Sequence, residues 1–225
     1  MNYKGYSVSF EIAGPTAMWT RPDCGDSPCS YPAPTYSAAK ALFEGILWGP
    51  AIQIIPRKVE LCSPPQFHSY VTNYGGPLRS TDAFKKGNNY QMYATVLLDV
   101  CYRLYADVVP NPEKSKMPAN ALDWDRRTTS PGHAYQEIFQ RRIKRGQSFR
   151  TLCLGWSEFT ASYFGPFRDN TRVHTELPDI PIPSMLREVF SDGYKSEFNA
   201  IYDTNIFIRN GVLMYPERKE MVHDQ

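Results

Sequence analysis

The sequence predicts an α+β fold whose elements follow the order strand-helix-strand-strand-helix-strand, the order of a ferredoxin-like domain. Segments that alternate apolar and polar residues, as half-buried strands do, surround two segments with helix start and stop signals. Near the end of the chain, an Asn-Gly pair between two apolar runs indicates a tight hairpin. We therefore expect a ferredoxin-like RNA-binding domain over residues 1–160 and a small antiparallel β appendage over residues 161–225.

The first strand and the first helix are predicted between residues 7 and 48. Ser7 to Ala13 alternates in polarity and places its apolar residues on one face, which indicates the first strand. Thr35 is a residue type that caps helices, and the helix it begins is stopped by Gly49-Pro50. We interpret Trp48, at the end of this helix, as a core residue rather than a base-stacking platform.

Two strands follow, separated by a long polar segment. Ala51 to Cys62 is rich in Ile and Val, and Pro56 within it predicts a bulge or an edge position. Tyr93 to Ala106 is the longest strand candidate. Ser63 to Gln91 is longer than ordinary loops, so we expect a hairpin extension or a mobile arm. Its basic residues are Arg79, Lys85 and Lys86.

The second helix has clear signals at both ends. Ser130 can cap the free amides, Pro131 suits the first turn, and Gly146 supplies the stop, which predicts a helix over 131–145. Thr151 to Thr160 is predicted as the fourth strand. Further along, Asn210-Gly211 predicts a type I′ turn.

The cysteines and the apolar runs restrict the class of protein. Five cysteines at positions 24, 29, 62, 101 and 153 form an odd number without CxxC spacing, which favours neither a zinc site nor a disulfide framework. We expect Cys62, Cys101 and Cys153 to be small hydrophobic residues in strands. No run of 18 apolar residues and no signal-peptide core occurs, so we expect a soluble, cytoplasmic chain without a membrane partner.

Positive charge is concentrated in one stretch of the chain. Between Arg126 and Arg150 seven basic residues face one acidic residue, Glu137, so this stretch carries +6 while the whole chain carries +2. Its basic residues before Arg150 are Arg126, Arg127, Arg141, Arg142, Lys144 and Arg145. Cations at a helix end complement the helix dipole, yet four within five residues exceed what capping requires. With aromatic residues interleaved, the stretch favours an anionic partner such as nucleic acid.

Three motifs, in order along the chain, are similar to one family. The first is residues 10–14 (FEIAG) with 18–22 (MWTRP), the second is 29–40 (CSYPAPTYSAAK) with 46–52 (ILWGPAI), and the third is 138–142 (IFQRR) with 145–147 (RGQ) and 154–159 (LGWSEF). Together they resemble the Dvulg-type Cas subunit of CRISPR subtype I-C, in the RAMP superfamily. The resemblance covers nearly the whole chain and is weak over residues 103–129.

The resemblance implies a role in RNA-guided antiviral defence. Such a subunit grips the repeat-derived 5′ handle of the guide RNA (crRNA) within a surveillance complex, Cascade, with backbone and large subunits as partners and target DNA as an indirect one. Arg21 and Lys40 lie within the family motifs, and we expect them to contact phosphate or neighbouring subunits. Arg126, Arg127, Arg141, Arg142, Lys144 and Arg145 are the other expected RNA contacts. Neither a cofactor nor a metal is implied.

The family's cutting activity transfers less completely. In subtype I-C this subunit also cuts the repeat precursor without metal, using a tyrosine before the helix-ending tryptophan and a lysine-histidine pair at the start of the second helix. The matching positions here hold Leu47, Gly132 and His133. Leucine cannot accept or donate a proton and glycine carries no charge, so two of the three catalytic groups are absent. We therefore expect the RNA-binding role of the family here and not its nuclease role.

His133 is the candidate catalytic residue that remains. Metal-free RNA cleavage needs a 2′-hydroxyl deprotonated, a 5′-oxygen protonated and phosphate charge neutralised, and a histidine such as His133 is able to perform one of these functions. The candidates for a substitute cation are Arg126, Arg127 and Lys144. The candidates for a substitute base are Tyr31, Tyr36, Tyr135 and His68, but Tyr135 lies on a different helix face from His133 and better suits packing.

Two functions therefore remain as alternatives to that of an RNA-binding Cascade subunit. In one, the chain is an active metal-independent endoribonuclease that processes repeat RNA through His133 and substitute groups. In the other, it is a single-stranded RNA-binding domain outside CRISPR. The third motif and the lack of an aromatic RNP1 pattern on a central strand argue against this last possibility.

Overall fold

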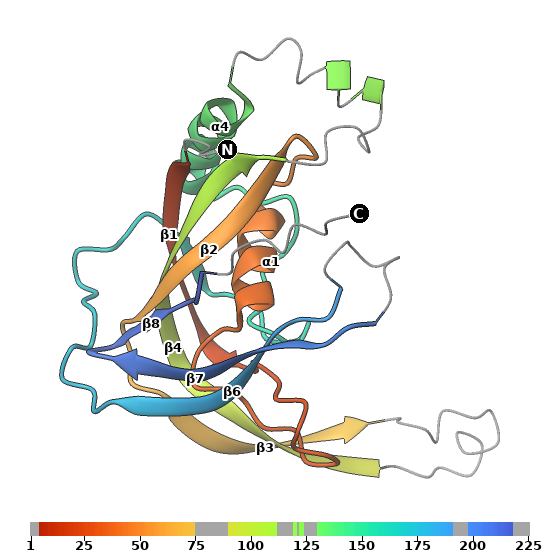
Figure 1. Ribbon diagram of the computed structural model, residues 1–225. Coiled ribbons are helices and arrows are strands. Elements are labelled where there is room, and N and C mark those ends of the chain that lie inside the picture. The colour runs from red at the N-terminus through yellow and green to blue at the C-terminus, as the bar shows by residue number, and fades with distance from the viewer. Residues whose placement is uncertain are drawn as a thin grey trace.

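A computed structural model describes residues 5–74, 90–111, 119–120, 122–123, 130–190 and 198–217. It shows a mixed α and β fold with a curled antiparallel sheet of eight strands that wraps around α1 (Figure 1). The strands are β1 (Tyr6–Ala17), β2 (Ile52–Leu61), β3 (Gln66–Tyr74), β4 (Tyr90–Pro110), β5 (Tyr163–Gly165), β6 (Ile180–Glu188), β7 (Ile201–Arg209) and β8 (Val212–Met214), and the long helices are α1 (Tyr36–Ile46) and α4 (Pro131–Arg145). Neither of these helices is long and apolar enough to span a membrane, and no other described helix is.

The long strand β4 organises the sheet. The strand order is β5-β1-β4-β2-β8-β7-β6, and β3 pairs with the outer end of β4. The predicted strand over Tyr93 to Ala106 is confirmed and extends at both ends. Within the segment expected as a hairpin extension, Gln66–Tyr74 pairs with Tyr90 to Leu98 and projects away from both helices (Figure 1). Residues 75–89, with Arg79, Lys85 and Lys86, lie outside the described residues.

Three phenylalanines join the sheet to both helices. Phe10 of β1 contacts Phe43 of α1 and Phe139 of α4, with ring centroids 4.9 Å and 6.1 Å apart, and Phe43 stacks on Phe139. All three side chains are fully buried. Because one residue of β1 touches both helices, α1 and α4 cover the same face of the sheet.

The helix signals are largely confirmed, although α1 ends at Ile46 and not at the predicted stop, Gly49-Pro50. Thr35 Oγ1 accepts a hydrogen bond from the Ala38 amide and begins α1, as predicted. Gly146 ends α4 in the left-handed region with φ 62°, which glycine adopts without strain. Ser130 was expected to cap α4, but it makes no side-chain cap bond, because its hydroxyl instead donates to the Tyr6 hydroxyl at 3.0 Å.

The predicted strand over Thr151 to Thr160 is wrong. This segment makes one isolated bridge, between Cys153 and Thr160, and the position beside β1 is taken by β5. The chain turns within the segment because Leu154 donates to the Phe159 carbonyl and both side chains are buried. Gly155, with φ 99°, passes so close to the Met18 carbonyl that no side chain fits there.

Two local predictions in the strands are confirmed. The register of β2 on β4 shifts between Pro56 and Lys58, which is the bulge expected at the proline. Asn210 and Gly211 both have positive φ, 49° and 74°, as a type I′ turn requires. This turn joins β7 to β8, and β8 continues the sheet on the free side of β2.

The cysteine interpretation needs correction. Cys24 and Cys29 form a disulfide, inside a loop whose ends meet at the bridge between Thr20 and Ser30. The bridge could not be predicted because the two cysteines lack CxxC spacing, and it is the folded loop that brings their thiols together. Cys101 is buried in β4 as expected. Cys62 and Cys153 are only half-buried and lie outside the named strands.

A buried ion pair connects the strands near the end of the chain to α1. Arg187 of β6 donates to Asp203 of β7 at 3.0 Å, and both side chains are almost fully buried. The Arg187 guanidinium also lies 3.8 Å from the centroid of the Tyr36 ring. The apolar residues of these strands belong to the same core as those of β1 and β4.

Candidate RNA-binding surface

The end of α4 exposes three cations on one face. Arg141, Lys144 and Arg145 are three and four positions apart, which places them together on the helix surface, and all three are exposed. Among the residues that the structure describes, no acidic side chain pairs with them. They are therefore available to an anionic partner.

Arg142 has a different role from its neighbours. It is half-buried, and its guanidinium donates to the Ile46 carbonyl at 2.5 Å, at the end of α1. A helix leaves its last carbonyls without internal partners, and Arg142 satisfies one of them. Part of the positive charge predicted to bind RNA thus stabilises the junction of the two helices.

Two aromatic rings are exposed at the same junction. Trp48, two residues beyond α1, is 59% exposed, so its interpretation as a core residue is wrong. The helix ends at Ile46 and Leu47 adopts an extended conformation, which takes the chain away from the core before Trp48. Phe149 is 69% exposed, and its amide donates to the Gly45 carbonyl at 2.9 Å. The loop that follows α4 is therefore fastened to the last turn of α1.

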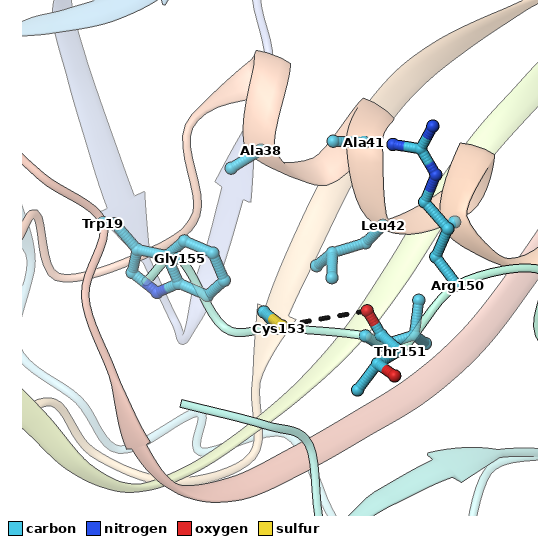
Figure 2. A pocket seen from close by; sticks show the side chains of 10 residues that line it. Trp19, Ala38, Ala41, Leu42, Arg150, Thr151, Cys153 and Gly155 are labelled. Carbon is cyan, nitrogen blue, oxygen red and sulfur yellow. Dashed lines mark hydrogen bonds between the residues drawn. The ribbon is translucent and has the colours of Figure 1, made fainter. Parts of the chain in front are cut away.

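A shallow pocket lies between α1 and the segment that follows α4 (Figure 2). Its volume is about 220 Å³, below the range of 300 to 1,000 Å³ that is typical of small-molecule sites. Its lining is largely apolar, and Arg150 extends along α1 beside Ala41 (Figure 2). The Arg150 guanidinium is also 6.0 Å from the centroid of the Phe149 ring. A cation and an aromatic ring thus adjoin the pocket.

The other end of α4 holds the candidate catalytic histidine. His133 is exposed, and its ring lies edge-to-face with the Tyr6 ring at a centroid distance of 5.7 Å. A Cβ atom at Gly132 would lie 2.7 Å from Cδ2 of Tyr6. A lysine at position 132 would therefore require the Tyr6 ring to move. Glycine at position 132 thus leaves the space that the Tyr6 ring occupies.

The tyrosines considered as substitute bases are buried. Tyr135 donates to the Leu47 carbonyl at 2.5 Å, and burial raises its pKa well above the usual value. Tyr31 accepts a bond from the Leu186 amide, Tyr36 lies under Arg187, and burial raises both pKa values. Each is held in packing, as was expected for Tyr135. His68 is exposed on β3.

The remaining candidate contacts are placed elsewhere or lie outside the described residues. Arg21 pairs with Asp23 at 2.7 Å in the disulfide-closed loop. Lys40 lies 4.0 Å from Glu44 on α1. Neither has a described contact with the basic end of α4. Arg126 and Arg127, which were expected to contact RNA, lie outside the described residues.

The sheet face opposite the helices carries a network that sequence reasoning missed. Glu11 is fully buried and accepts from Arg168 Nε and from the Thr171 hydroxyl, both at 2.6 Å, and from Arg103 at 3.4 Å. Burial opposes its ionisation, but the bonds from Thr171 and Arg168 prevail and lower its pKa. Glu11 stands between Phe10 and Ile12 in an apolar strand, and this was the one available signal.

No cluster of three or more potential metal-ligating side chains occurs within the described part of the chain. What the structure assembles instead is a surface of cations and exposed rings where α1 and α4 end. Such a surface suits an anion that also presents flat apolar faces.

Comparison with known proteins identifies the family. Residues 7–219 match the family described as "CRISPR-associated protein (Cas_Cas5)", in its Cas5d form. The chain belongs to the Cas5d family. This membership confirms the resemblance found in the three sequence motifs, and it assigns the chain to the Cas5 subunits of subtype I-C.

Two Cas5d relatives carry the name "CRISPR pre-crRNA endoribonuclease Cas5d". The protein of Thermus thermophilus is 32% identical over 160 residues, which cover 71% of this chain and 63% of the relative, so the match spans under two thirds of that protein. The protein of Mannheimia succiniciproducens is 30% identical over 178 residues, 72% of this chain and 73% of the relative.

The fold of the Cas5d chain is also found among solved structures. A structure described as "Crystal Structure of CRISPR-associated Protein" matches with a TM-score of 0.71 at 19% identity, over 98% of this chain and 97% of the other. At this identity the match establishes the shared fold.

Proposed function

We propose that this chain binds the 5′ handle of crRNA as a subunit of a type I-C surveillance complex, Cascade, in the cytoplasm, with target DNA an indirect partner. The observation that carries the proposal is the exposed basic face of Arg141, Lys144 and Arg145, which no described acid neutralises. Both relatives named above carry the name pre-crRNA endoribonuclease, which supports RNA as the anion that binds here.

The arrangement of the strands supports a ferredoxin-like domain over residues 1–160. The strands β1 and β2, connected through α1, lie on either side of β4, which is a split β-α-β arrangement. Residues 161–225 would then form the β appendage, in which β6, β7 and β8 extend the sheet beyond β2 and the short β5 pairs with β1.

The covered sheet face weighs against a generic RNA-binding domain outside CRISPR. RNA-recognition domains of the common type stack bases on aromatic residues of an open sheet. Here the part of that face around Glu11 and Arg103 is covered by residues near Arg168, which bind both side chains. Binding at the end of α4 agrees with this arrangement.

The binding proposal is tested by the salt dependence of affinity. The double variant Arg141→Ala/Lys144→Ala should weaken binding of repeat RNA and flatten the plot of log affinity against log salt by about 0.7 per lost contact. Arg142 is left intact because it supports the end of α1. Filter binding or fluorescence anisotropy across a salt series provides the measurement.

The matched control is Arg209→Ala, an exposed arginine of β7 that pairs with Asp179. It should leave the slope unchanged. An unaltered slope in the α4 double variant, with normal folding by circular dichroism, would remove this face from the RNA interface.

The projecting β3–β4 hairpin leads to a prediction about partner subunits. Tyr74 pairs with Tyr90, so residues 75–89 can be replaced by an Asn-Gly turn that closes the hairpin. We expect the shortened chain to fold and bind RNA but to assemble poorly with the backbone and large subunits in co-purification. Loss of soluble protein instead would show that these residues are needed for folding.

The second candidate function is cleavage of pre-crRNA, which the names of both relatives favour. His133 and Tyr6 are the described groups at the matching end of α4. Where the family resemblance implies a tyrosine and a lysine, this chain has Leu47 and Gly132, which weighs against cleavage.

A further inference from the structure

We propose that Trp48 and Phe149 form a base-stacking surface for single-stranded RNA at the junction where α1 and α4 end. The inference rests on the proposed RNA-binding function and adds to it the part of the RNA that is recognised there, the faces of the bases. Neither residue was expected to contact RNA from the sequence.

The first support is that four hydrogen bonds hold the backbone next to the two rings at one junction. The Phe149 and Arg150 amides both donate to the Gly45 carbonyl, at 2.9 Å and 3.0 Å. Arg142 donates to the Ile46 carbonyl and Tyr135 to that of Leu47, immediately before Trp48. The backbone around both rings is therefore fixed before any ligand binds, which lowers the entropic cost of binding.

The second support is exposure next to unneutralised charge. Trp48 and Phe149 are 59% and 69% exposed, among the most exposed large apolar side chains described. Exposed single rings are common on protein surfaces, so exposure alone indicates nothing. Phe207, for example, also adjoins an arginine, but that residue, Arg209, pairs with Asp179. No described acid pairs with Arg150, beside Phe149.

The chemistry of single-stranded RNA fits this combination. Its phosphates need cations, which Arg141, Lys144 and Arg145 supply on the neighbouring face of α4. Its unstacked bases present flat apolar faces that stack on aromatic side chains and on guanidinium planes. Stacking tolerates any base, so this surface contributes affinity without reading sequence.

The test compares two RNAs of equal charge. One is a synthetic 5′-handle RNA from the chain's own repeat, and the other is an oligonucleotide of the same length with abasic ribose throughout. Trp48→Ala and Phe149→Ala should each weaken binding of the first RNA about tenfold and leave binding of the second unchanged. Trp48→Phe and Phe149→Tyr should restore most of the affinity because they keep a ring.

The basic double variant Arg141→Ala/Lys144→Ala should weaken binding of both RNAs. Phe198→Ala removes a ring that is 75% exposed beside Phe190 and provides a control that should change neither affinity. Handle RNA should also quench the fluorescence of the wild-type chain more than that of Trp48→Phe, a readout that does not depend on the alanine variants folding.

The outcomes separate the two proposals. Unchanged affinity for base-bearing RNA in both alanine variants, or equal losses on the two RNAs, would overturn stacking while the basic variant still supports RNA binding. Equal quenching in wild type and Trp48→Phe would exclude Trp48 from the surface. Absence of binding by the wild-type chain to either RNA would overturn both proposals.

Discussion

The purified wild-type chain should cleave its own repeat RNA slowly or not detectably, while binding of the same RNA persists. Losing one positioned acid, base or cation costs a factor of about a hundred or more in rate, and members of one catalytic unit do not act additively. At the positions where the family resemblance implies two such groups, this chain has Leu47 and Gly132. The three tyrosines considered as substitutes, Tyr31, Tyr36 and Tyr135, are all buried, which leaves His68 as the exposed candidate base among the described residues.

The measurement is a single-turnover cleavage assay with labelled repeat RNA, alongside binding of a version with 2′-deoxyribose at the cut site. Any remaining cleavage should persist in chelator, require the 2′-hydroxyl upstream of the cut and decrease further in His133→Ala. Tyr6→Phe offers a matched comparison, because it keeps the ring beside Gly132 and removes only the hydroxyl that Ser130 contacts.

A restoring variant makes this prediction more specific. Gly132→Lys alone should not recover activity, because its side chain meets the Tyr6 ring. Leu47→Tyr/Gly132→Lys combined with Tyr6→Ala removes that obstruction, and we expect faster cleavage from it than from the wild type. Fast wild-type cleavage that His133→Ala leaves unchanged would contradict both the site and the argument from the missing groups, and would direct attention to His68.

Replacing Glu11 with glutamine should destabilise the fold by about 3–5 kcal/mol, as expected when one partner of a buried ion pair is removed. Its carboxylate is fully buried and accepts from Arg103, Arg168 and Thr171. Without the negative charge, Arg103 and Arg168 lose the carboxylate that both of them contact. Chemical unfolding should show a lower midpoint, and the melting temperature should fall by roughly 10 °C. Glu176→Gln, an exposed carboxylate, is the control.

The same residue should make stability depend on pH. Because the folded-state pKa of Glu11 is lowered, its contribution is complete above the unfolded-state pKa of the carboxyl and is lost as pH falls through the folded-state value. Wild type should therefore lose stability in acid more steeply than Glu11→Gln. Parallel pH profiles for the two proteins would show that Glu11 is not ionised in the native network.

The sequence by itself determined the features that depend on neighbouring residues. Thr35 and Gly146 fix helix ends because a cap bond and a left-handed residue act within one turn. Asn210-Gly211 fixes its turn because both residues tolerate positive φ. The family motifs also lie in the sequence, and so do the departures at Leu47 and Gly132.

Only the tertiary structure decided which side chains remain free to bind a ligand. Arg141 and Arg142 are adjacent and identical, yet Arg142 alone meets a carbonyl of α1. Trp48 is exposed because α1 ends before it, and Gly132 packs against Tyr6, 126 positions away in the chain. The buried bonds of Glu11 likewise come from distant segments. Such contacts arise when the chain folds, and no local pattern specifies them, because each depends on a partner remote in sequence.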